Sequence, residues 1–91
     1  MKPVLTESKP QLWRAVAIFE DGQECLLYLG ASSPQIRAGY LRAFNDVLEA
    51  EQREQVKAIL LQRWNGAPDA GRWIEQAELS LPKALRLAKS A

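Results

Sequence analysis

The side chains best suited to molecular recognition gather around a glycine-rich stretch near the C-terminus. Residues 65–71 read Asn-Gly-Ala-Pro-Asp-Ala-Gly, a composition that stops helices and predicts a loop. Arginine next to tryptophan is typical of protein-binding surfaces. The predicted partner-contacting residues are Arg63, Trp64, Asp69, Arg72 and Trp73. The alternative is that both tryptophans belong to the core and anchor the loop ends.

Catalytic constellations are absent from the sequence. The chain has no histidine, which removes the commonest general base and the usual partner of a serine or cysteine nucleophile. A single cysteine, Cys25, cannot supply the thiolates of a zinc site, and its leucine-rich surroundings predict a core position. The glycines at 66 and 71 lack the lysine of a phosphate-binding loop. We therefore predict a noncatalytic protein with no cofactor and no metal site.

The charge is balanced over the whole chain but not along it. Twelve Lys and Arg against eleven Asp and Glu give a net charge of +1, so no strong field attracts nucleic acid or membrane. Residues 83–91 carry Lys83, Arg86 and Lys89 without an acid, which leaves nine cations and eleven acids in residues 1–82. The sequence also lacks a signal-peptide-like or membrane-spanning apolar run. We expect a cytoplasmic protein with no membrane partner.

Residues 12–29 carry the clearest local signal. Two apolar runs flank Asp21-Gly22, which predicts a β-hairpin with a two-residue turn. This register places Ile18 opposite Cys25 and Val16 opposite Leu27. Both faces of such a hairpin are apolar, so helices must cover one of them and another surface, such as a second subunit, must cover the other.

The middle of the chain has helical spacing. Ser32-Ser33-Pro34 is a good helix start, since serine caps free amides and proline suits the first turn. The apolar residues that follow at helical spacing are Ile36, Tyr40, Phe44, Val47, Leu48, Val56, Ile59, Leu60 and Trp64. A polar stretch interrupts them, and we favour two helices over one across residues 34–64.

A third strand is favoured over a helix for residues 72–81, because Trp73, Ala77, Leu79 and Leu81 occupy odd positions. The predicted fold class is α+β, with a hairpin, two helices and a third strand (ββααβ) and an antiparallel sheet with helices packed on one face. The predicted organisation is an extended arm at residues 1–10, a single domain at 11–82 and a basic tail at 83–91.

The predicted function is a small protein-interaction or adaptor module that self-associates into a homo-oligomer, because apolar faces outnumber the elements available to cover them. The alternative is a DNA- or RNA-binding module. Its contact residues would be Arg14, Arg37, Arg42, Lys83, Arg86 and Lys89. In layout, residues 11–48 resemble the small arm-binding and AP2-like DNA modules of phage-type recombinases, which implies DNA contact by the hairpin. Arg14 is the one cation of this hairpin, however, against Glu20, Asp21 and Glu24.

Overall fold

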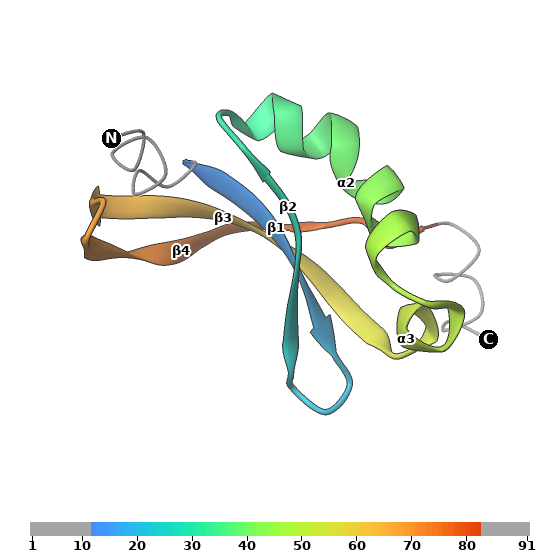
Figure 1. Ribbon diagram of the computed structural model, residues 1–91. Helices are drawn as coiled ribbons and strands as arrows, with labels where there is room; N and C mark the ends of the chain where they lie inside the picture. Colours follow the sequence, from blue (N-terminus) through green and yellow to red (C-terminus); the bar gives the residue numbers. More distant parts are fainter. Residues whose placement is uncertain (1–11, 83–91) are drawn as a thin grey trace, which may run out of the picture.

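The computed structural model describes residues 12–82, which form one four-stranded antiparallel sheet and two helices (Figure 1). The elements are β1 (Trp13–Phe19), β2 (Glu24–Gly30), α2 (Ser33–Val47), α3 (Ala50–Glu54), β3 (Val56–Ala67) and β4 (Ala70–Leu79). The strand order is β2-β1-β3-β4. The α+β class is confirmed. The ββααβ order is wrong, because two strands, not one, follow the helices. The predicted arm at 1–10 and tail at 83–91 lie outside the described residues.

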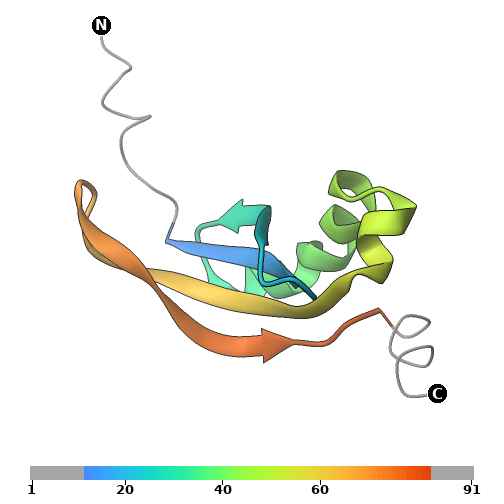
Figure 2. The same ribbon diagram turned by 90° about the horizontal axis from the view of Figure 1, so that it is seen from below.

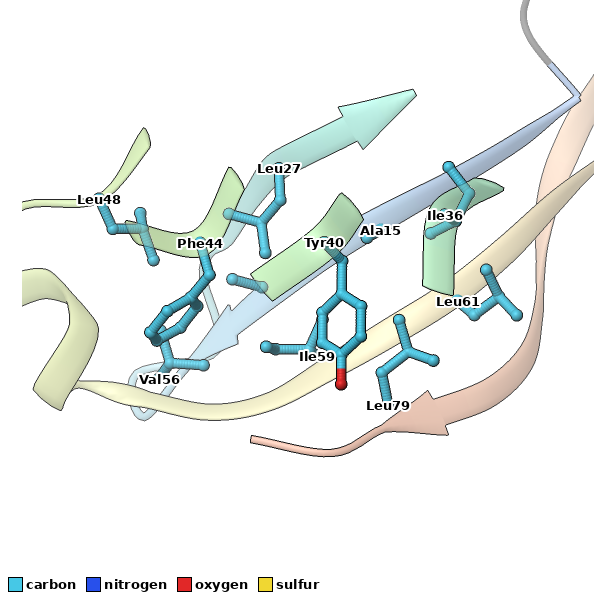
Figure 3. Packing of buried hydrophobic residues seen from close by; sticks show 11 residues of the cluster. Ala15, Leu27, Ile36, Tyr40, Phe44, Leu48, Val56, Ile59, Leu61 and Leu79 are labelled. Carbon is cyan, nitrogen blue, oxygen red and sulfur yellow. The ribbon is translucent and has the colours of Figure 1, made fainter. Parts of the chain in front are cut away.

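Both helices lie on the same side of the sheet (Figure 2). The long helix α2 directs Ile36, Tyr40 and Phe44 toward the strands, and Figure 3 shows these side chains meeting residues of β1, β2, β3 and β4. The strand residues of this core are Ala15, Ala17, Leu27, Val56, Ile59, Leu61 and Leu79, each 5% exposed or less. The Tyr40 hydroxyl donates to the carbonyl of Ser80 at 2.7 Å, which fixes the end of β4 beneath the helix. We call this side of the sheet the covered face.

The predicted hairpin is confirmed, but its turn is one residue longer than expected. Gly22 N–H donates to the Phe19 carbonyl at 2.9 Å, and Phe19 N–H donates to the Gln23 carbonyl at 2.8 Å. Three residues therefore form the loop, with Gly22 at φ +91°, where a side chain would be strained. Val16 pairs with Leu26 rather than with Leu27, and Ile18 pairs with Glu24 rather than with Cys25. The shift exchanges the faces of Cys25, Leu26 and Leu27.

The helix start is confirmed, and the two-helix prediction is correct only up to residue 54. The Ser32 hydroxyl accepts from Gln35 N–H at 3.3 Å, and the chain leaves α2 at Leu48. Helix α3 then begins with the Glu49 N–H donating to the Gln52 side chain at 2.8 Å. Arg53 holds the junction, since its Nη1 donates to the carbonyls of Asn45 and Leu48.

The helix predicted through residues 56–64 is wrong, because this segment is β3. It lies between β1 and β4 and is apolar on both sides: Ile59 and Leu61 enter the core, while Leu60 lies on the other side. A central strand of this kind has a continuous apolar run rather than an alternating one, and such a run also fits a helix. Backbone pairing with both β1 and β4 stabilises this segment as a strand.

The loop predicted for residues 65–71 is also wrong. Strands β3 and β4 stay paired as far as Ala67 and Ala70, which leaves Pro68 and Asp69 as the turn. Gly66 has φ +121°, and a Cβ added to it would lie 2.7 Å from the Gly71 Cα. The glycines thus permit close pairing of two strands instead of ending a structured element. The third strand predicted at 72–81 is confirmed as β4.

The outer part of the hairpin formed by β3 and β4 projects beyond the sheet. Trp13 of β1 pairs with Arg63, and one further contact follows, in which Trp64 N–H donates to the Leu12 carbonyl at 2.8 Å. We call the two-stranded part, residues 64–67 with 70–73, the ribbon; it extends away from the helices in Figure 1. The edge strands are β2 and β4. The pairing of β2 with β1 contains an irregularity of the β-bulge type, and so does the pairing of β4 with β3.

Candidate functional site

The side of the sheet opposite the helices is the main candidate surface. No helix of the described part of the chain lies on it (Figure 2). The strand register assigns to it Arg14, Val16, Ile18, Glu24, Leu26, Leu29, Ala58, Leu60, Gln62, Trp64, Trp73, Glu75 and Glu78. We call these residues the uncovered face.

The middle of the uncovered face is an apolar block. Its members are Val16, Ile18, Leu26, Leu29 and Leu60, which adjoin one another on β2, β1 and β3. Leu26 is 45% exposed and Leu29 is 42% exposed. Val16 is only 2% exposed, yet it does not belong to the core beneath α2. Apolar side chains thus extend over three strands on the side that the helices leave open.

An aromatic and arginine cluster borders this block at the base of the ribbon. Trp64 and Trp73 face each other across β3 and β4, with ring centroids 5.3 Å apart and planes at 71°. The Trp64 indole donates to the Ala67 carbonyl at 3.0 Å. The guanidinium of Arg14 lies 4.3 Å from the centroid of the Trp73 ring, and its Nε donates to Gln62 Oε1 at 2.7 Å.

Burial lowers the pKa of Arg14, and the nearby Glu24 carboxylate opposes this shift. Arginine stays charged even so. These contacts hold the cation and the two rings in a fixed arrangement on the surface.

The five predicted partner-contacting residues do not form one site. Trp64 and Trp73 lie on the uncovered face, whereas Arg63 pairs with Trp13 on the opposite side, where its guanidinium is 6.0 Å from the Trp13 ring. Arg72 pairs with Asn65, also away from the tryptophan pair, because neighbouring strand positions alternate between faces. Asp69 is exposed in the turn. The tryptophans are half-buried, which is intermediate between the two alternatives of an exposed binding residue and a core residue.

The residues of the nucleic-acid alternative do not converge in the described part of the chain. Arg14 lies on the uncovered face between Leu29 and Gln62, while Arg37 and Arg42 are exposed on α2 on the other side of the sheet. Arg37 donates to the Ser33 hydroxyl at 3.3 Å, and Arg42 pairs with Asp46 at 3.8 Å. Lys83, Arg86 and Lys89 lie outside the described residues.

Groups that could carry chemistry are sparse over residues 12–82. No three metal-ligating side chains come together there. Cys25 is a half-buried free thiol that packs against the core, which agrees with its predicted role as a small apolar residue. No helix in this range is both long enough and apolar enough to cross a bilayer.

Comparison with protein-family models, with curated proteins and with solved structures gives no match.

Sequence reasoning missed most of the apolar block as a binding surface. The signal was present, because both faces of the predicted hairpin are apolar and helices can cover only one. Leu26 was assigned to the wrong side by the turn-length error, and Leu60 was assigned to a helix. The surface needs the pairing of β1 with β3, which joins residues 37 to 50 positions apart in the sequence.

Proposed function

We propose that this protein is a noncatalytic protein-interaction module that docks a partner chain on its uncovered face. The observation that carries the proposal is the apolar block on the side opposite the helices, where Leu26 and Leu29 are each more than 40% exposed. An apolar centre with polar residues at its margin is the usual composition of a protein–protein interface.

The shape of the sheet supports docking on the face rather than on an edge. Both edge strands, β2 and β4, have a bulge in their ladders. Bulges twist an edge and interrupt its row of free backbone groups, which opposes the addition of a further strand. Side chains, not backbone hydrogen bonds, therefore provide the main contacts.

The size of the face is that of a small interface. Four strands about 4.8 Å apart and seven residues long span roughly 19 by 23 Å, a plane area of about 440 Å² before side-chain relief is added. A standard interface buries roughly 800 Å² of accessible surface on each partner, so a partner would have to cover the whole face. Arg14 and Trp73 adjoin this patch as a preformed cation and ring, and both residue types are common among residues that dominate binding energy.

The test is a comparison of two equally exposed leucines. Leu29 on the uncovered face and Leu41 on α2 are both 42% exposed, so Leu29→Glu and Leu41→Glu are matched variants. The wild type and both variants are each used for affinity capture from the native cell. The wild type and Leu41→Glu should recover the same partner. Leu29→Glu should not recover this partner, because burying a carboxylate in an apolar contact is costly.

Circular dichroism serves as the control for folding in this comparison, and sedimentation velocity of the same samples reports self-association. Equal recovery by all three proteins would contradict the proposal, as would a copurifying nucleic acid whose retention depends on neither leucine.

A further inference from the structure

The charged groups of the uncovered face are unevenly divided. Glu75 pairs with Gln62, Glu78 with Leu60 and Glu24 with Ile18, which places three carboxylates around the apolar block. Arg14 is the one cation at a paired position of this face in the described residues, and Lys57 lies at the irregularity of β3. At these paired positions, one cation and three acids give a net charge of −2.

This negative charge favours some binding partners of the uncovered face over others. Two copies placed face to face would bring two negative surfaces together, and like charges across an interface are unfavourable. An occupant that is both apolar and cationic matches the block and its margin. Arg14 does not neutralise the margin fully, since its side chain is held by Gln62 and Trp73.

The chain contains a segment of this composition. Residues 83–91 read Lys-Ala-Leu-Arg-Leu-Ala-Lys-Ser-Ala, with three cations, no acid and two leucines. They follow β4, the edge strand that carries Glu75 and Glu78. Nine residues reach at most about 30 Å, which exceeds the roughly 19 Å width of a four-stranded sheet.

We propose that residues 83–91 dock on the uncovered face of their own chain, with Leu85 and Leu87 on the apolar block and the cations near the carboxylates. Tethering provides an effective concentration in the millimolar range, while exposed ion pairs contribute little each. The docking is consequently reversible, and the segment competes with the partner for one surface. This inference rests on the proposed function, because it identifies the competitor of that same face.

The test places a spin label on the full-length chain. Ala88→Cys in a Cys25→Ser background gives one thiol for the label. The methyl signals of Leu26, Leu29 and Leu60 should then lose most of their intensity, while those of Leu41 on α2 keep theirs. Reversal of the three cations (Lys83→Glu, Arg86→Glu, Lys89→Glu) should restore the signals, and adding Glu75→Lys with Glu78→Lys should remove them again.

Three results would overturn the inference. Broadening that is equal on Leu41 and on the uncovered face would show that the segment has no preferred site. Broadening of unlabelled, isotope-enriched chains mixed with labelled chains would show that the segment binds a second copy. Unchanged signals in the labelled chain would show that the face is not occupied by this segment.

The same variants separate this inference from the proposed function. The cation-reversed chain should retain more partner in affinity capture than the wild type does, because its competitor is weakened. If the label broadens no leucine but Leu29→Glu still loses the partner, only the inference fails. If the label broadens the three leucines and no partner depends on Leu29, the proposed function fails.

Discussion

The two faces of the sheet use similar residues for different purposes. On the covered face, Ile59 and Leu61 are at most 1% exposed beneath α2, so their contribution is to stability. On the uncovered face, Leu26 and Leu29 are more than 40% exposed, so they contribute little to folding and remain available to another chain. A residue's burial, more than its hydrophobicity, separates the two roles.

The largest expected effect is at the centre of the covered face. Phe44 is 2% exposed and packs between α2 and the strands, so Phe44→Ala should lower the free energy of unfolding by about 3–5 kcal/mol. Urea denaturation followed by circular dichroism measures this. Phe44→Leu keeps most of the volume and is the second variant if the alanine variant does not fold. A loss below 1 kcal/mol for Phe44→Ala would mean that α2 does not form the core.

An intermediate effect is expected at the base of the ribbon. Trp73→Leu removes the edge-to-face contact with Trp64 and the cation–π contact with Arg14, and it should lower the free energy of unfolding by about 1–2 kcal/mol. A double-mutant cycle with Arg14→Met isolates the cation–π part, and additivity of the two changes would show that the contact contributes nothing. A cost as large as that of Phe44→Ala would show that Trp73 is a core residue.

The smallest effect is expected for the exposed leucines. Leu29→Ala should change the free energy of unfolding by less than about 1 kcal/mol, because most substitutions at exposed positions have small effects. The same denaturation experiment measures it, with Leu41→Ala as the matched control. A loss of 2 kcal/mol or more, at protein concentrations where the chain is monomeric, would mean that Leu29 is buried in solution and that the two faces do not differ as described.

The two hairpins show how far sequence reasoning reaches. The β1–β2 hairpin follows from Asp21-Gly22 and its flanking strands, all within about twenty residues, and only the length of its turn was wrong. The β3–β4 hairpin depends on Val56, Ile59 and Leu61 pairing with β1, far away in the sequence. Their spacing fits a helix as well as a central strand, and local patterns do not separate the two.

The candidate site had the same limits. Residue type alone indicated that Trp64 and Trp73 could belong to a binding surface. The side of the sheet on which each arginine lies, however, depends on the register of β3 against β4. Arg63 and Arg72 are next to tryptophans in sequence and away from the tryptophan pair in space. Arg14, which does contact Trp73, is almost sixty residues distant and belonged only to the nucleic-acid alternative.

The position of the tryptophans has a practical consequence for spectroscopy. All three of the chain's tryptophans lie at one end, since Trp13 pairs with Arg63 and Trp64 pairs with Trp73 at the next position. Beyond that point the ribbon has only two strands, and two-stranded hairpins open more readily than a sheet with a core. Trp64 and Trp73 belong to the ribbon, whereas Trp13 packs against the core, so two of the three tryptophans report opening of the ribbon. Far-ultraviolet circular dichroism reports the whole fold. The two signals should separate on heating, with the emission shift preceding the loss of ellipticity.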